Sequence, residues 1–327
     1  MSNFQQQNRN FWLVYLVNMI YNDKQMKGAP YMSVKCYETE YQNFGRCVCL
    51  ENGIIKLMAT IEVGPRIIYF GAQGKSNILF EDVERDFYEM NRGYGIWYAY
   101  GGHRLWSAPE LMPETYLPDN NPVSYTFKNN TLVLTPDMTI SKKQFQLVCE
   151  MTEGNVVHIT NSITNCSDEP QRFAPWSVTG FASGGTELIP LCSTKTGFLP
   201  NRTMALWSYS DIRDERFHLT NNYATLRHDA NRKDAFKVGF NVDDGYVIYA
   251  ANGQVFRKSF ANYEKANYPD YCCNFETYTN KHFLEVELLG EEREYNPMET
   301  ASLKESWEIT ETKLSPDDVI SSYIQKI

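Results

Sequence analysis

Residues 100–110, YGGHRLWSAPE, bring together four side chains that can each do chemistry. His103 titrates near neutral pH and can move a proton in either direction. Arg104 can hold a carboxylate or two neighbouring hydroxyls with its planar guanidinium, and Trp106 offers a broad apolar face. Glu110 adds a carboxylate. We interpret the segment as one wall of a binding cleft; the structural alternative is a loop in which Arg104 pairs with Glu110 while Trp106 fills the core.

Three more carboxylates stand in strand-like segments near the C-terminus. In HFLEVELLG, residues 282–290, Leu284, Val286 and Leu288 lie on one face of a strand. Glu285 and Glu287 share the other face, roughly 7 Å apart at strand spacing. Glu276, in NFETYTN, is the third carboxylate. On a solvated face all three are ordinary surface residues, whereas in a cleft one of them becomes a general base; the sequence leaves open which one.

Two lysines lie between aromatic residues in further strand-like segments. They are Lys237 in FKVGF and Lys258 in FRKSF. A lysine in this setting is expected to run its stem along apolar neighbours and keep its ammonium in water. Lys237 is also a candidate for contacting the hydroxyl groups of a ligand.

Composition excludes several classes of protein. The net charge is −9 and no basic cluster is present, which argues against binding to nucleic acid or to an anionic membrane. The aromatic content of 14% suits both a sandwich core and a groove that stacks on ligand rings. The eight cysteines fit neither a zinc site nor a disulfide framework, so we expect reduced thiols and a cytoplasmic protein. No motif calls for a metal or a cofactor.

The hydrophobic pattern has period two from residue 44 onward, broken by turn signals. KKQFQLVCEM and VVHITNSITN flank TEGN and predict a hairpin, and AFKVGFNV, YVIYA and QVFRKSF predict three strands joined at DDG and ANG. Only the last stretch is helical, with Ser315 as N-cap, Pro316 at the first position and Asp318 completing a capping box. Together these signals predict an all-β fold, a large antiparallel two-sheet sandwich with few short helices.

Residues 1–31 stand apart from this pattern. FWLVYLV is too short to span a bilayer, for which about 20 apolar residues are needed, and only Arg9 precedes it as a basic residue. Lys27-Gly28 can be encoded by codons that resemble a ribosome-binding sequence upstream of Met32. We therefore expect an N-terminal extension, from a gene start assigned too early, followed by a single domain over residues 32–327.

A set of ordered segments resembles the galactose mutarotase-like superfamily, within an uncharacterised bacterial branch. The segments are GIIKLMATIEVGPRIIYFG, YGGHRLWSAPE, RFAPWSVTGFASGG, ALWSYSDIRDERF, FKVGFN, YPDYCCNFETYTNKHFLEVELLG and PMETASLKESWEI, which cover roughly residues 44 to 311. No single segment is decisive, but their order is characteristic of the branch. The resemblance implies a β-supersandwich with a sugar site across one concave sheet.

The resemblance also implies residue roles. Mutarotases interconvert the α and β anomers of a sugar by opening its ring, with a glutamate as base, a histidine as acid and an arginine that holds the sugar. The glutamate falls at Glu285, with Glu287 beside it, and the arginine falls at Arg104. The family's acid histidine aligns with APWSVTG, where this chain has Trp176. His103 is then the candidate to supply the acid.

Three functions remain open on this basis. The first is an aldose 1-epimerase-like isomerase in which Glu285 and His103 are catalytic and Arg104 anchors the sugar. The second is a carbohydrate-binding protein without catalysis, in which Trp106, Trp176 and tyrosines stack on a mono- or oligosaccharide. The third is a glycoside hydrolase that pairs Glu285 with Glu276 or Glu110, which requires two carboxylates about 5–9.5 Å apart.

A protein that begins at Met32 should express and melt at the same temperature as the full chain, because residues 1–31 show no strand pattern. Thermal unfolding followed by circular dichroism compares the two directly. A large fall in the melting temperature of the shorter protein would mean that FWLVYLV packs into the core.

Overall fold

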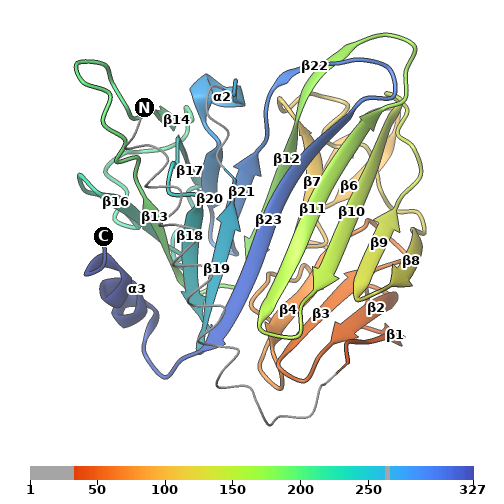
Figure 1. The fold of residues 1–327 in the computed structure, drawn as a ribbon, viewed down its shortest axis with the longest axis horizontal. Coiled ribbons are helices and arrows are strands. Elements are labelled where there is room, and N and C mark those ends of the chain that lie inside the picture. The colour runs from red at the N-terminus through yellow and green to blue at the C-terminus, as the bar shows by residue number, and fades with distance from the viewer. Residues whose placement is uncertain (1–32, 262–265) are drawn as a thin grey trace, which may run out of the picture. The chain divides into compact units, whose positions relative to one another are not determined.

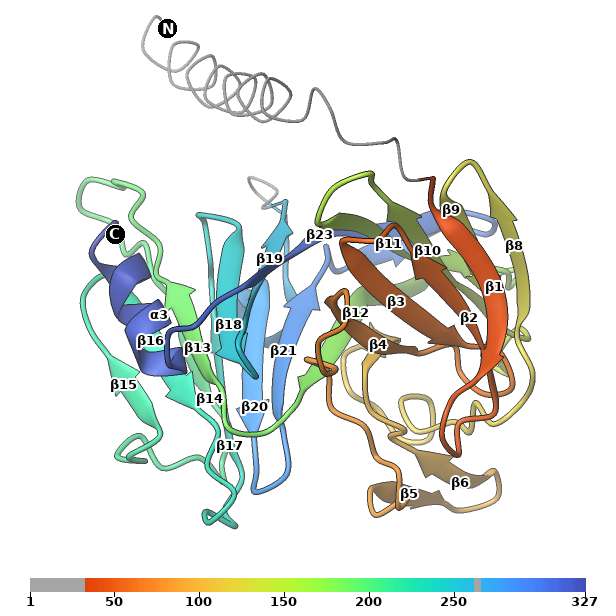
Figure 2. The same cartoon turned by 90° about the horizontal axis from the view of Figure 1, so that it is seen from below.

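Two large antiparallel β-sheets stack face to face in this protein (Figures 1 and 2). The computed structural model describes residues 33–261 and 266–327, of which Val34–Ile327 belong to one compact unit. The expectation of an N-terminal extension over residues 1–31 falls outside the described residues. The all-β sandwich expected from the period-two pattern is confirmed.

The first sheet has 11 strands, and its central strands carry most of the candidate site residues. Its order is β1-β2-β3-β4-β7-β12-β21-β20-β17-β14, with β22 paired to β12. The strands are β1 (Lys35–Glu40), β2 (Arg46–Glu51), β3 (Ile55–Thr60), β4 (Ile67–Ala72), β7 (His103–Ala108), β12 (Gln171–Phe181), β14 (Met204–Leu206), β17 (Phe236–Phe240), β20 (Phe275–Thr279), β21 (Leu284–Leu289) and β22 (Arg293–Tyr295). Figure 1 shows β17, β20, β21, β12 and β7 following one another from left to right.

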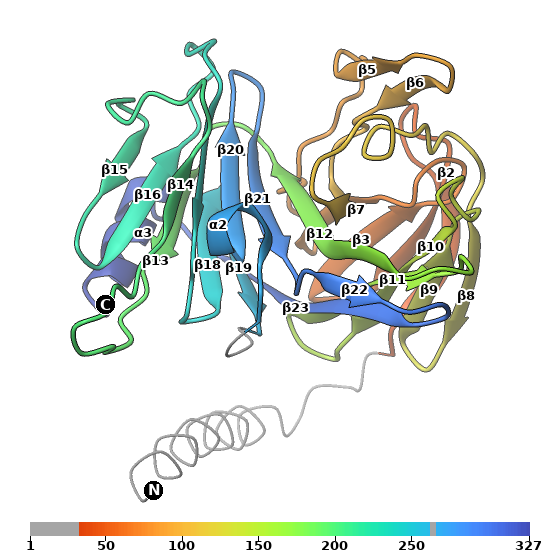
Figure 3. The ribbon, with the colours of Figure 1, turned by 90° about the horizontal axis from the view of Figure 1, so that it is seen from above.

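The second sheet has 10 strands, in the order β15-β16-β13-β18-β19-β23-β11-β10-β9-β8. The strands are β8 (Ser124–Lys128), β9 (Thr131–Thr135), β10 (Lys143–Met151), β11 (Val156–Asn165), β13 (Thr186–Pro190), β15 (Phe217–Leu219), β16 (Tyr223–Arg227), β18 (Tyr246–Ala251), β19 (Gln254–Phe260) and β23 (Thr300–Glu311). A separate hairpin of β5 (Tyr88–Asn91) and β6 (Gly95–Tyr98) projects from one end of the sandwich (Figures 2 and 3).

The strands predicted from the sequence are present, but one predicted connection between two of them is wrong. The predicted hairpin is β10 paired with β11 over nine residue pairs, Lys143↔Asn165 through Met151↔Val157. The segments YVIYA and QVFRKSF pair as β18 and β19. FKVGF, however, is β17 of the other sheet, so the DDG turn carries the chain from one sheet to the other and is not a hairpin turn.

The C-terminal helix α3 (Pro316–Ile324) confirms the predicted capping. The side chain of Ser315 accepts a hydrogen bond from the Asp318 backbone N–H, and Pro316 occupies the first turn. Val319 and Ile320 pack on Leu188 and Ile248 of β13 and β18, which covers part of the second sheet (Figure 2). The only other helical element in the described ranges is the single turn α2 (Pro269–Cys272).

The main hydrophobic core lies between the two sheets. Alternate residues of many strands point into it, among them Leu284, Val286 and Leu288 of β21, as the alternation in the sequence predicts. The eight cysteines are free thiols. Among the described residues, no helix is long and apolar enough to cross a membrane.

A charged pair is buried within this core. Lys258 Nζ lies 2.9 Å from Glu305 Oε2, and both side chains are completely buried. Trp307 Nε1 and Asn161 Nδ2 donate to the same carboxylate at 2.9 Å and 2.6 Å. Burial alone would raise the pKa of Glu305, but Lys258 and His103 lower it to about 2. The expectation that Lys258 keeps its ammonium in water is therefore wrong.

Replacing Glu305 with glutamine should destabilise the protein by about 3–5 kcal/mol, because the variant leaves the Lys258 ammonium buried without a counter-charge. Chemical denaturation of wild type and Glu305→Gln measures the loss. Glu311→Gln is the matched control, since Glu311 ends the same strand, is exposed and pairs only with the surface residue Lys75. Equal stability of the two variants would contradict the role given to the buried pair.

Candidate functional site

The glycines of YGGHRLWSAPE set the path of the chain into β7. Gly101 and Gly102 have φ values of 95° and 64°, in the left-handed region that favours glycine. A Cβ on Gly102 would stand 2.1 Å from the carbonyl oxygen of Ile67 in β4. Only glycine permits this close approach, after which β7 begins at His103.

Successive residues of β7 point to opposite faces of the first sheet. We call the face turned away from the second sheet the outer face. Arg104 and Trp106 lie on the outer face, opposite Val178 and Trp176 of β12. His103 points the other way, toward the second sheet, where it contacts Asn161 of β11.

His103 is thus separated from the residues it was expected to join. Its ring is fully buried, with Nδ1 2.8 Å from Thr179 Oγ1 and Nε2 3.0 Å from Asn161 Oδ1. Burial lowers the pKa of His103 to about 4, so the ring is neutral at pH 7. The expectation that His103 lines the site beside Arg104 is wrong, because period two places neighbouring residues of one strand on opposite faces.

Strand register aligns the other candidates on the outer face. Glu287 of β21 stands opposite Val178 of β12 and opposite Glu276 of β20. Glu285 stands opposite Tyr278, which in turn stands opposite Lys237 of β17. Side chains directly opposite each other in neighbouring strands share a face. We call Arg104, Trp176, Lys237, Glu276, Glu285 and Glu287 the carboxylate cluster.

Lys237 holds two of the glutamates. Its Nζ lies 2.7 Å from Glu276 Oε2 and 2.9 Å from Glu287 Oε2. Trp176 Nε1 also donates to Glu287 Oε2, at 2.8 Å. Burial alone would lower the pKa of Lys237, but Glu287 and Glu276 raise it above its ordinary value. The expectation of a solvated ammonium is wrong for Lys237 as well, and its candidacy as a ligand contact stays a proposal.

Glu276 keeps its proton at neutral pH. Burial raises the pKa of Glu276 to about 9, with Lys237 opposing the shift and Glu287 adding to it. Because Oε2 accepts from Lys237, the proton belongs on Oε1, which has no hydrogen-bond partner in the structure. Gly239 stands opposite Glu276, and a Cβ there would meet Cys273 Sγ at 2.8 Å. The glycine therefore leaves room for the Cys273 side chain, which packs beside Glu276.

Glu285 is held separately from the other two glutamates. Arg104 Nη2 donates to Glu285 Oε1 at 3.1 Å, and the two side chains are 6% and 12% exposed. Burial raises the pKa of Glu285, while the positive charge of Arg104 opposes the shift. The face therefore presents one carboxyl group held by Arg104 and a second, that of Glu276, held by Lys237.

Aromatic rings surround these charges. The Arg104 guanidinium lies 4.0 Å from the ring centroid of Trp106, and the centroids of Trp106 and Trp176 are 5.1 Å apart. Lys237 Nζ lies 4.6 Å from the ring centroid of Trp207, a residue that sequence reasoning did not single out. Tyr278 was also missed, although it follows Glu276 by two residues and so shares its face.

Glu110 takes no part in the ion pairs of the cluster. It is exposed, and its Oε1 accepts a hydrogen bond from the Tyr116 hydroxyl at 2.6 Å. Since Arg104 pairs with Glu285, the alternative of an Arg104–Glu110 pair is wrong. Among the described residues, no group of three His, Cys, Asp or Glu side chains is arranged to hold a metal ion.

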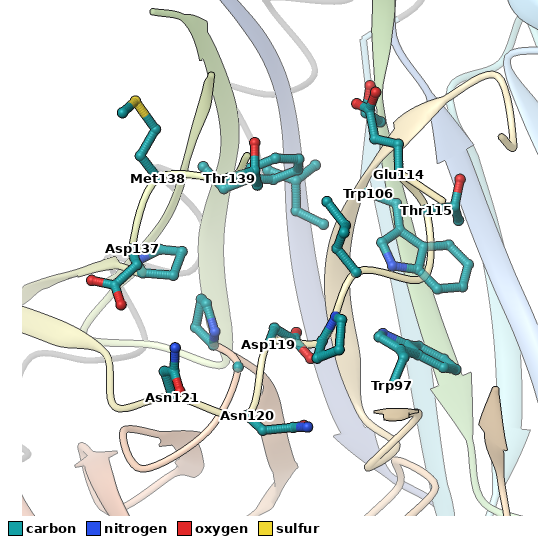
Figure 4. A pocket seen from close by; sticks show the side chains of 18 of the residues that line it. Trp97, Trp106, Glu114, Thr115, Asp119, Asn120, Asn121, Asp137, Met138 and Thr139 are labelled. Atoms are coloured by element: carbon teal, nitrogen blue, oxygen red, sulfur yellow. The ribbon is translucent and has the colours of Figure 1, made fainter. Parts of the chain in front are cut away.

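A cavity of about 490 Å³ (Figure 4) is lined in part by Trp106, whose ring contacts Arg104 and Trp176 of the cluster. It opens where β4 and β7 part, because the two strands pair only at Ile67↔His103. Beyond that point, residues 105–107 of β7 line the cavity. Figure 4 shows Trp97 and Trp106 on one side of it and Met138 with Thr139 on the other.

Comparison with known proteins identifies the fold. No protein-family model and no curated protein sequence matches this chain. A TPR-domain containing protein from Parabacteroides distasonis matches with a TM-score of 0.58 at 12% identity over 82% of this chain, and the match spans 48% of that longer protein. A proposed aldose 1-epimerase from Klebsiella pneumoniae gives 0.57 at 10% identity over 92% of this chain and 90% of its own.

A galactose mutarotase-like protein from Clostridium acetobutylicum gives a TM-score of 0.55 at 12% identity, over 85% of this chain and 99% of its own. Identities this low carry information on the fold and not on the reaction. The sandwich described above thus has the galactose mutarotase-like fold.

Proposed function

We propose that this protein binds a carbohydrate on the outer face of the first sheet and interconverts its anomers by acid–base catalysis. One observation carries the proposal: three carboxyl groups from β20 and β21 meet two cations and an indole on one sheet face. Removing this many charges from water is costly, and buried ion pairs stabilise a fold only weakly. Carboxyl groups with shifted pKa values are typical of functional sites.

Carbohydrate is the ligand class that these side chains suit best. Carboxylates accept hydrogen bonds from sugar hydroxyls, and flat indoles pack against the C–H faces of sugar rings. Trp106 supplies such a ring beside Arg104 and Glu285. Proteins named for aldose 1-epimerase and galactose mutarotase share the fold, which agrees with this ligand class.

The proposed reaction assigns one proton transfer to each of two glutamates. Glu285, whose ionised form Arg104 favours, takes the proton from the anomeric hydroxyl. Glu276 donates the proton on its Oε1 to the ring oxygen, the C1–O5 bond breaks, and the open aldehyde forms. Rotation about C1–C2 and closure by the reverse transfers return both protons and give the other anomer. Glu276 thus takes the acid role that His103 cannot fill, and Trp176 holds Glu287 by a hydrogen bond.

Replacing Glu285 with glutamine should abolish anomer exchange while changing sugar affinity by no more than about tenfold, because the amide keeps the shape but cannot accept the proton. A panel of free aldoses is first screened for binding by thermal shift. Exchange between anomers is then followed by NMR magnetisation transfer on each sugar that binds. Glu294→Gln, at an exposed position of β22, is the matched control.

Each outcome of this experiment assigns a function. Exchange that persists in Glu285→Gln removes Glu285 as the base. Binding without exchange in wild type favours a carbohydrate-binding protein without catalysis. Release of 4-nitrophenol from aryl glycosides would indicate a hydrolase instead, and no binding by any sugar would refute the proposal.

The protonated state of Glu276 predicts a dependence of stability on pH. Its pKa is about 9 in the folded protein against an ordinary 4.5, so between these values the folded state holds a proton that the unfolded chain has released. The free energy of unfolding should fall as pH rises through this window, by about 1.4 kcal/mol per pH unit at most from this group.

Glu276→Gln removes this contribution because the amide does not titrate. Denaturation at pH 6, 7 and 8 should show a shallower fall for the variant than for wild type. Parallel pH profiles of the two proteins would mean that Glu276 is ionised in the folded state and cannot act as the acid.

A further inference from the structure

We propose that the cavity beside Trp106 is a second sugar subsite, so that the ligand is a neutral oligosaccharide of two or more units. This inference rests on the proposed function, since it extends the carbohydrate from the carboxylate cluster into the cavity. The cavity volume of about 490 Å³ falls within the usual range for small-ligand sites.

The cavity and the cluster share the indole of Trp106. This ring lines the cavity, lies 4.0 Å from the Arg104 guanidinium, and lies 5.1 Å from the Trp176 ring. Trp97 continues the same wall, with its ring 5.3 Å from Trp106 (Figure 4). A sugar bound at Glu285 and extended past Trp106 would bring its neighbouring unit to this aromatic wall.

An ion pair in the cavity wall, between buried Arg66 and partly exposed Asp119, has one donor and one acceptor unused. Arg66 is 2% exposed, and its Nη1 bonds Asp119 Oδ2. Arg66 Nη2 and Asp119 Oδ1 have no hydrogen-bond partner in the structure. An unsatisfied buried polar group is costly, so each calls for a partner.

The charge of this pair selects a neutral ligand. Glu114, Asp119 and Asp137 line the cavity and oppose an anionic group. Arg66 opposes a cationic group beside Asp119, so a neutral ligand is favoured at this pair. Two adjacent hydroxyls, one accepting from Arg66 Nη2 and one donating to Asp119 Oδ1, satisfy both atoms. Asn120, Asn121 and Thr139 add uncharged polar groups to the wall, as a sugar ring requires.

The test compares each monosaccharide with its disaccharides by isothermal titration calorimetry: glucose with maltose and cellobiose, galactose with β-1,4-galactobiose, mannose with β-1,4-mannobiose, and xylose with xylobiose. At least one disaccharide should bind about tenfold or more tightly than its monosaccharide, because the second ring gains the aromatic wall and two hydrogen bonds. Met138→Trp, at an exposed position on the rim of the cavity, should reduce this ratio to near one without changing monosaccharide affinity.

Asp119→Asn should also reduce the disaccharide advantage, and Asp211→Asn, at an exposed aspartate remote from the cavity lining, is its matched control. Equal affinity of every monosaccharide and its disaccharides in wild type would refute the second subsite while leaving the proposed function standing. A disaccharide advantage that survives Met138→Trp would place the second unit elsewhere and equally refute it. Binding of none of these sugars would refute both proposals.

Discussion

The ammonium of Lys237 lies within 3 Å of two carboxyl groups, and the rest of the outer face is organised around this contact. Three glutamates share the face with two cations, so the carboxyl groups outnumber the positive charges. Burial raises the pKa of Glu276 to about 9 and also raises the pKa of Glu285, where Arg104 opposes the shift. The proposed acid and base are thus two residues of the same type that differ in their environment.

A buried ion pair lies on the core side of the same sheet. Lys258 Nζ contacts Glu305 and Thr179 and lies 3.4 Å from the backbone carbonyl oxygen of Val286. Val286 stands between Glu285 and Glu287 in β21. Charges in the core therefore support the strand that carries Glu285 and Glu287. Such a buried pair adds little stability over an apolar core but fixes strand position, and a site that must hold two carboxyl groups in different protonation states depends on fixed positions.

Local pattern predicted the parts of the site that lie within one strand. Alternation alone placed Glu285 and Glu287 on one face and the neighbouring leucines in the core. It did not show where β7 begins, so His103 and Arg104 were grouped although period two sends them to opposite faces. Burial of Lys237 and Lys258 depends on pairing between strands far apart in the sequence, and the cavity depends on where β4 and β7 separate. Neither is encoded in a local pattern, because both arise from register and loop packing.

The most direct test of the central claim is a crystal structure of the protein with the tightest-binding sugar from the panel. The account predicts a sugar ring on the outer face, with its anomeric hydroxyl within hydrogen-bonding distance of Glu285 and its ring oxygen within reach of Glu276 Oε1. A sugar bound away from the carboxylate cluster, or one that turns a different oxygen toward Glu285, would contradict it.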